Sequence, residues 1–145
     1  MPANKFTSDQ KERIKEAIKD AERNTSGEIR VHIDKKCKAD VLDRAAYVFE
    51  QLKMHKTRLR NGVLFYLAME DHKFAILGDA GINSVVPDHF WNDIKDMMAG
   101  YFREGQFTEG LESGIKEAGE QLKKHFPYRL DDENELEDEI SFGNQ

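Results

Sequence analysis

The feature that most constrains the fold is an unbroken apolar run, GVLFYLAM, over Gly62–Met69. A strand that is apolar at every position must be covered on both faces, as the central strands of α/β proteins are. A short polar turn, Glu70–Lys73, separates it from a second apolar segment, Phe74–Leu77. So short a connection predicts a β-hairpin. The sheet therefore needs helices from elsewhere in the chain on both of its faces.

A third strand is predicted over Glu28–Asp34, where apolar and polar residues alternate as EIRVHID. Ile29, Val31 and Ile33 face one side of the sheet, and the polar residues face the other. Because one face is polar, we expect this strand nearer the sheet edge. It reaches Gly62–Met69 through a helix, so the two strands are expected to be parallel.

Helical periodicity accounts for most of the remaining chain. Thr7 begins the first helix with Gln10 three residues later, which is a capping-box pattern, and Pro87 favours a helix start. The four predicted helices are Thr7–Arg23, Asp40–Met54, one from Pro87 to near Gly105, and Thr108–His125. The resulting order, α-β-α-β-β-α-α, predicts a three-layer α/β/α sandwich with a small mixed sheet.

The charge distribution divides the chain into two parts. Residues 129–145 hold seven acids and one base, which accounts for the whole net charge of −6. Residues 1–128 are expected to form the folded domain, and their charges balance, so we expect no nucleic-acid partner. We expect the acidic tail to be flexible or partly docked, with Glu139–Phe142 as a candidate short strand. The tail is also a possible contact for a protein partner.

The sequence gives few signs of export or of covalent catalysis. The first ten residues contain no apolar h-region, so we expect no signal peptide. No apolar run is long enough to span a membrane, and Cys37 is the only cysteine. We therefore expect a cytoplasmic protein. A cysteine phosphatase loop needs an arginine six residues after its cysteine, where this chain has Asp43. Serine-elbow, Walker, zincin and EF-hand motifs do not occur, so the catalytic residues stay unknown.

The loop after the predicted hairpin is the candidate binding site. Gly78-Asp79-Ala80-Gly81 ends the hairpin next to the expected start of the other strands. Its two glycines favour a tight turn with accessible carbonyl groups. Hard oxygen donors nearby suit Ca²⁺ or Mg²⁺, and the predicted metal ligands are Glu28, Asp79, Asn83 and Asp88.

Two alternatives to this site stay open. In the first, Asp79 only caps a turn and Glu28 is a solvated residue at the start of its strand. In the second, a cation binds at the opposite rim of the sheet, where helix caps and hairpin-tip residues supply five acids: Asp34, Asp40, Asp43, Glu70 and Asp71.

Five segments resemble the TPM domain family, also called TPM phosphatase, in order and spacing. They are TSGEIRVHI, RNGVLFYLA, KFAILGDAGIN, VPDHFWNDI and FREGQFTEGL…HFP, and the match covers roughly Thr7 to Tyr128. The closing NELEDEISFG is similar to the tail of short, soluble bacterial members. The family loop usually reads Gly-Tyr-Gly-Leu-Glu, whereas this chain has Asn83 near the place of the glutamate and Asp79 as another carboxylate.

The resemblance implies an α/β/α sandwich and binding of a divalent cation, Ca²⁺ or Mg²⁺. The family name reflects an acid phosphatase activity attributed to a plant member, and other relatives act as accessory proteins. Three functions follow for this chain: a cation-binding protein, a metal-dependent phosphatase of phosphomonoesters, or an accessory interaction module.

Overall fold

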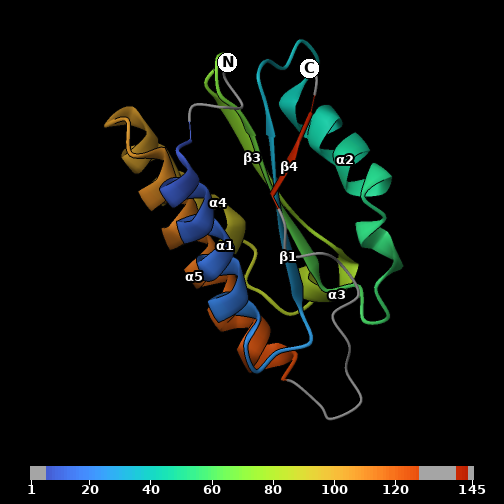
Figure 1. Cartoon of the computed structure of the whole chain (residues 1–145). Coiled ribbons are helices and arrows are strands. Elements are labelled where there is room, and N and C mark those ends of the chain that lie inside the picture. Colours follow the sequence, from blue (N-terminus) through green and yellow to red (C-terminus); the bar gives the residue numbers. More distant parts are fainter. Residues whose placement is uncertain (1–5, 128–139, 144–145) are drawn as a thin grey trace.

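The computed structural model describes residues 6–127 and 140–143. A four-stranded sheet of order β3-β2-β1-β4 lies between two helical layers. Helices α1, α4 and α5 cover one face and α2 covers the other (Figure 1). The predicted three-layer sandwich with a mixed sheet is therefore confirmed. The acidic residues 128–139 lie outside the described part of the chain, so the predicted division at residue 128 stays a prediction.

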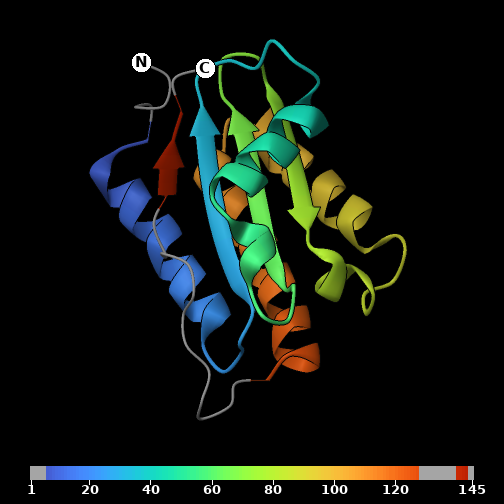
Figure 2. The ribbon, with the colours of Figure 1, turned by 90° about the vertical axis from the view of Figure 1, so that its right-hand side faces the viewer.

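The sheet is mixed, as the hairpin and the helical crossover predict. Strand β1 (Glu28–Asp34) runs parallel to β2 (Gly62–Ala68), with Glu28 opposite Gly62 and Asp34 opposite Ala68. Strand β3 (Lys73–Gly78) returns antiparallel to β2. Figure 2 shows the strands side by side, with β3 pointing opposite to the other three.

Strand β1, which was expected nearer the sheet edge, lies one place inside it. The short strand β4 (Ile140–Phe142) pairs parallel with the last part of β1, through Val31, His32 and Ile33. All seven residues of β1 are buried, including the polar face that suggested exposure. The confirmed strand in the predicted Glu139–Phe142 segment is what places β1 inside the sheet.

The long helices occur where the periodicity places them, with small differences at their ends. Helix α1 (Ser8–Glu22) has the predicted capping box, with Thr7 and Gln10 each accepting from the other's backbone N–H. Asp40 caps α2 (Val41–Gln51), which is followed by the 3-10 helix η2 (Met54–Lys56). Helix α4 (Phe90–Arg103) starts three residues later than predicted, and α5 covers Phe107–His125.

A short helix, α3 (Ala80–Asn83), was not predicted. It follows β3 directly and fills the loop that the sequence marks as a candidate site (Figure 1). The side chain of Asp79 accepts a hydrogen bond from Ala80 N at 2.8 Å and so caps this helix. The loop is thus a folded element rather than an open turn.

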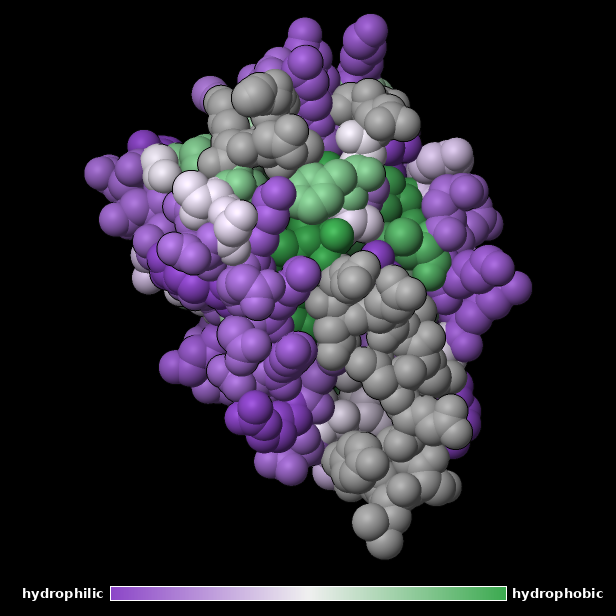
Figure 3. All heavy atoms as spheres, viewed as in Figure 1, coloured by the Kyte–Doolittle hydropathy of each residue, from purple (hydrophilic) through white to green (hydrophobic). Residues whose placement is uncertain are grey.

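The core has two parts, one on each face of the sheet. Ile29, Val31 and Ile33 pack with α1, α4 and α5, whereas Leu64 and Tyr66 of β2 face α2. Figure 3 shows a mostly hydrophilic surface over α1, with apolar residues visible in the centre of the view. None of the helices in the described residues is both long enough and apolar enough to cross a membrane.

Candidate functional site

The candidate site lies at the end of the sheet where β1 and β2 begin and β3 ends, here called the Asp79 end. The register places Glu28 opposite Gly62, and Gly78 opposite Val63. Asp79 N also donates to Gly62 O at 3.0 Å. The predicted gathering of the Glu28 and Gly78–Asn83 segments at one end of the sheet is therefore confirmed.

Asp79 is a buried carboxylate at this end and is paired with an arginine. Its residue is only 6% exposed, and Arg60 donates to both of its oxygens, from Nε at 2.6 Å and from Nη2 at 2.7 Å. The Asp79 hydrogen bond and charge raise the pKa of Arg60. The Arg60 side chain is half exposed, so its guanidinium lies between the buried Asp79 carboxylate and the solvent.

The two glycines of the loop serve close packing. A Cβ on Gly81 would lie 2.1 Å from Leu59 O, and a Cβ on Gly78 would lie 2.6 Å from Cζ2 of Trp91. Neither glycine has a positive φ, so the expected tight turn is not the reason for them. Arg60 O accepts from Gly81 N at 2.8 Å, which joins α3 to the loop that carries Arg60.

The other predicted ligands lie around this centre. Asn83, at the end of α3, accepts from Trp91 Nε1 at 2.7 Å and donates to Gly78 O at 2.8 Å. Asp88 is exposed between α3 and α4, whereas Glu28 is 2% exposed and thus not the solvated residue of the alternative reading. Within residues 6–127 and 140–143, no three His, Cys, Asp or Glu side chains form a group suited to a metal. The three predicted carboxylates are therefore at one end of the sheet without converging.

The opposite end of the sheet, here called the Asp34 end, holds a buried ionic network that the sequence reasoning missed. Asp34 is fully buried and accepts from Arg44 Nε at 2.9 Å and from Tyr66 Oη at 2.5 Å. His32 Nε2 lies 3.1 Å from its other oxygen, and His32 Nδ1 lies 2.7 Å from Ser141 Oγ. The polar alternation in EIRVHID was the available signal, because its polar residues face α2 and β4.

Burial by itself would raise the pKa of Asp34, but hydrogen bonds from His32, Arg44 and Tyr66 outweigh it and lower the pKa to about 2. Burial and the Asp34 hydrogen bond raise the pKa of Tyr66. Asp34 is thus a fixed anion with all of its charge matched inside the protein. Such a network stabilises one arrangement of strands and offers little to an incoming cation.

Cys37 is also at the Asp34 end. It is 1% exposed, and its Sγ donates to Ala39 O at 3.3 Å. Its backbone N donates to Asp71 Oδ2 at 2.7 Å, which fixes the loop after β1. A buried thiol with a carbonyl partner is a structural group, because a nucleophilic cysteine needs access and a stabilised thiolate.

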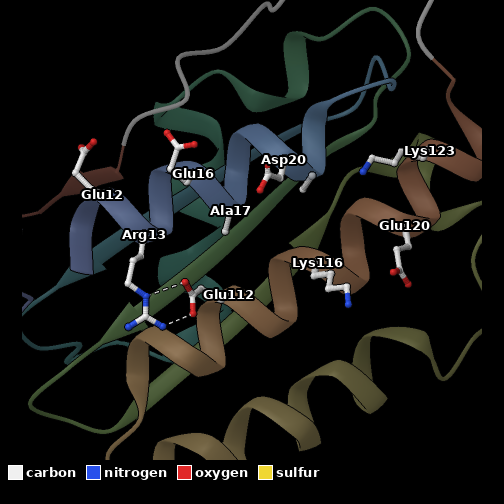
Figure 4. Close-up of a pocket in the computed structure, with 10 residues that line it drawn as sticks. Glu12, Arg13, Glu16, Ala17, Asp20, Glu112, Lys116, Glu120 and Lys123 are labelled. Atoms are coloured by element: carbon white, nitrogen blue, oxygen red, sulfur yellow. Dashed lines mark hydrogen bonds and ion pairs between the residues drawn. The ribbon is translucent and has the colours of Figure 1, made fainter. Parts of the chain in front are cut away.

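A surface groove of about 560 Å³ runs between α1 and α5 (Figure 4). Arg13 crosses it to Glu112, with Nε–Oε2 and Nη2–Oε1 distances of 3.0 and 2.6 Å. Its walls carry both signs of charge, with Glu16 and Asp20 on α1 and Lys116 on α5. The groove therefore favours neither an anionic nor a cationic ligand.

The fold and this end-of-sheet loop define a class: an α/β/α sandwich whose small mixed sheet is closed at one end by a capped, glycine-containing turn of helix. The chain belongs to the TPM domain family, whose sequence model matches residues 1–121. Among curated proteins, none matches the chain significantly.

Three solved structures are similar to the chain. The BA42 protein of the psychrophilic bacterium Bizionia argentinensis is 49% identical, with a TM-score of 0.89 and 97% of each chain covered. The N-terminal domain of a P. gingivalis protein is 20% identical, with a TM-score of 0.74 and 88% and 84% covered. The N-terminal domain of cg2496 from Corynebacterium glutamicum is 13% identical, with a TM-score of 0.65 and 81% and 74% covered. The last two support the fold alone.

Proposed function

We propose that this TPM-domain protein binds a divalent cation, Ca²⁺ or Mg²⁺, at the Asp79 end of the sheet. The observation that carries the proposal is the buried Asp79 carboxylate, whose charge is matched by the half-exposed side chain of Arg60. Asn83 and Asp88 follow Asp79 in the sequence. Glu28 is the first residue of β1, which is separated from β3 by β2. These four residues supply the hard oxygen donors that Ca²⁺ and Mg²⁺ prefer.

The donor chemistry fits a hard cation, whereas the charge of Asp79 is already matched by a guanidinium. A bound cation would take over the role of Arg60, whose side chain would return to water. Because the carboxylates do not converge, we expect weak affinity, in the range of about 10⁻⁴–10⁻³ M that sites with few charged ligands have.

The test is a titration of the ¹⁵N-labelled protein with Ca²⁺ and Mg²⁺, followed by backbone amide shifts. We expect the largest shifts at residues 79–88 and near Glu28. Asp79→Asn removes the central charge at constant size and should abolish saturable binding. Arg60→Gln removes the cation that competes for Asp79, so the variant should bind Ca²⁺ and Mg²⁺ more tightly. The amide shifts should stay centred on residues 79–88, whereas a general effect of net charge would not be confined to one site.

Asp43→Asn is the matched control, because Asp43 is an exposed acid on α2. It should leave the affinity unchanged. Shifts centred instead on Asp34, Asp40, Glu70 and Asp71 would place the site at the Asp34 end and contradict the proposal.

A further inference from the structure

A small cavity opens between the tip of the β2–β3 hairpin and the turn that joins α4 to α5. Its volume is about 210 Å³, and its walls include Phe74, Phe102 and Phe107 from three different elements. The Phe74 and Phe102 rings meet edge to face with centroids 4.8 Å apart, and Phe102 stacks on Phe107 at 5.1 Å. All three residues are only half-buried, so ring surface remains open to the cavity.

The walls of the cavity, here called the aromatic pocket, are held by close packing between elements. Gly110 of α5 lets the Phe102 ring lie against the helix, because a Cβ there would be 2.6 Å from Cε1 of Phe102. Buried Leu67 and half-buried Ala99 complete the apolar wall. The shape of the pocket therefore exists before any ligand binds, which reduces the ordering cost of binding.

The one permanently charged side chain in the lining of the aromatic pocket is a cation, Arg103. The imidazole of His72 also lines the pocket, and among the residues that the structure describes no carboxylate does. The Nζ of Lys95 lies 5.9 Å from the Phe74 ring centroid. Helix α5 begins at Phe107, and its N-cap, Gln106, makes no side-chain capping bond, whereas Glu109 in its first turn offsets part of the positive end of the helix dipole.

We propose that the aromatic pocket binds a small aromatic carboxylate, with its ring against the three phenyl groups and its carboxylate beside Arg103. A cavity of about 150 Å³ holds benzene, so this one has room for one ring with a short side chain. A ligand of about ten heavy atoms at an ordinary efficiency binds with a Kd on the order of 1 mM. The pocket is at the hairpin tip, away from Asp79 at the end of β3, so this inference is independent of cation binding.

The experiment is an NMR titration of the full ¹⁵N-labelled chain with phenylacetate. We expect saturable shifts at the amides of His72, Ala99, Arg103 and Phe107. The neutral analogue 2-phenylethanol should bind the same place about three to five times more weakly, which is the effect of one exposed charge pair. Acetate, which lacks the ring, should cause no saturable shifts there.

Two variants separate the two parts of the site. Arg103→Gln should lower phenylacetate affinity to that of 2-phenylethanol, while Arg23→Gln, an exposed arginine at the end of α1, should change nothing. Ala99→Leu should fill the pocket and remove binding of both ligands. Equal binding of 2-phenylethylamine, an unchanged affinity in Arg103→Gln, or shifts that persist in Ala99→Leu would each overturn the proposal.

Discussion

Asp34 keeps its negative charge in a fully buried position because donors from β1, α2 and β2 meet its two oxygens. His32 is two residues from Asp34 in the sequence, whereas Arg44 and Tyr66 come from other elements, 10 and 32 residues away. The network therefore reports on the assembly of the sheet and α2 together. It contrasts with Asp79, whose one charged partner, Arg60, reaches solvent.

The first prediction concerns acid stability. The folded-state pKa of Asp34 is about 2 and its ordinary value is 3.8. The stabilisation is thus complete above pH 4 and is lost as the pH falls towards 2, where the folded protein also takes up the proton. The pKa difference corresponds to about 2 kcal/mol of unfolding free energy. Urea titrations at pH values between 5 and 2 should show this decline in the free energy of unfolding. It adds to the decline that the protonation of other acids causes.

Asp34→Asn should abolish this part of the pH dependence and lower stability at pH 7 by about 3 kcal/mol, because Arg44 loses its buried partner. Asp43→Asn, at an exposed position on α2, should keep the wild-type dependence of unfolding free energy on pH. If the unfolding free energy of Asp34→Asn falls with pH as steeply as that of the wild type, the lowered pKa of Asp34 is not the cause of the acid sensitivity.

The second prediction concerns phosphatase activity, which the family name raises. Cys37 is buried and its Sγ donates to Ala39 O, so it is not a nucleophile. Cys37→Ser should leave any hydrolysis of an aryl phosphate unchanged. Any turnover should require a divalent cation, since the sequence has neither a cysteine phosphatase loop nor a serine elbow and a metal-bound hydroxide would then be the attacking group. Robust activity in excess chelator would contradict this.

At the scale of elements, the packing of α1 on α5 depends on a glycine. A Cβ on Gly119 would lie 2.6 Å from Ala21 Cβ and 2.9 Å from Ala21 Cα. The second of these atoms is backbone, so one helix would have to move away from the other. Arg13 and Glu112, further along the same pair of helices, hold their other end together (Figure 4).

The third prediction follows from this contact. Gly119→Ala should destabilise the protein by about 1–3 kcal/mol through overpacking. Gly100→Ala is the matched control in α4, where a Cβ meets only Arg103 Nη2 at 3.9 Å. It should stabilise the protein by about 0.5–1 kcal/mol, since alanine favours a helix over glycine. Thermal unfolding of both variants measures the difference, and equal effects would show that the helix–helix contact is looser than described.

The elements that the sequence predicted are those with local signals. The Thr7–Gln10 capping box, the Asp40 cap and the apolar Gly62–Ala68 strand each depend on neighbouring residues, and each is found in the structure. Helix α3 escaped prediction because it has four residues and contains Gly81, which is more typical of a turn. The position of β1 escaped because it depends on Ile140–Phe142, more than a hundred residues away.

The same distinction applies to the candidate site. Topology was enough to bring Glu28 and the Asp79 loop to one end of the sheet. The pairing of Asp79 with Arg60 was not predictable, because it depends on the path of the loop before β2, where Arg60 has a φ of 53°. The family loop pattern likewise says nothing of the Trp91 indole that binds Asn83.

At the scale of the whole molecule, β4 links the end of the chain to the Asp34 network. Ile140 is 9% exposed, Ser141 Oγ contacts His32, and Gly143 N donates to Ile33 O at 3.1 Å. A Cβ on Gly143 would lie 1.9 Å from Asp34 Oδ1, so the backbone here is seated directly on the carboxylate. Residues 140–143 are thus part of the sheet.

The fourth prediction is that removing residues 129–145 leaves a cooperatively folding body that is less stable by roughly 3 kcal/mol. Burial of one isoleucine side chain and the hydrogen bonds of three paired residues account for this amount. A chain that ends at Gly143 is the control and should match the full protein. Loss of cooperative unfolding in the shorter chain would show that β4 is required for the fold.

The parallel pairing of β1 with β4 also has a consequence for biosynthesis. Ile33 is made about a hundred residues before its partner Phe142. At about 5–20 residues per second, β1 waits roughly 5–20 s for this partner. During that interval its free edge would invite pairing with another nascent chain, and the alternating charged residues Glu28, Arg30 and Asp34 discourage this. The polar face of β1 thus protects this edge until β4 is made, and holds β4 and α2 in place afterwards.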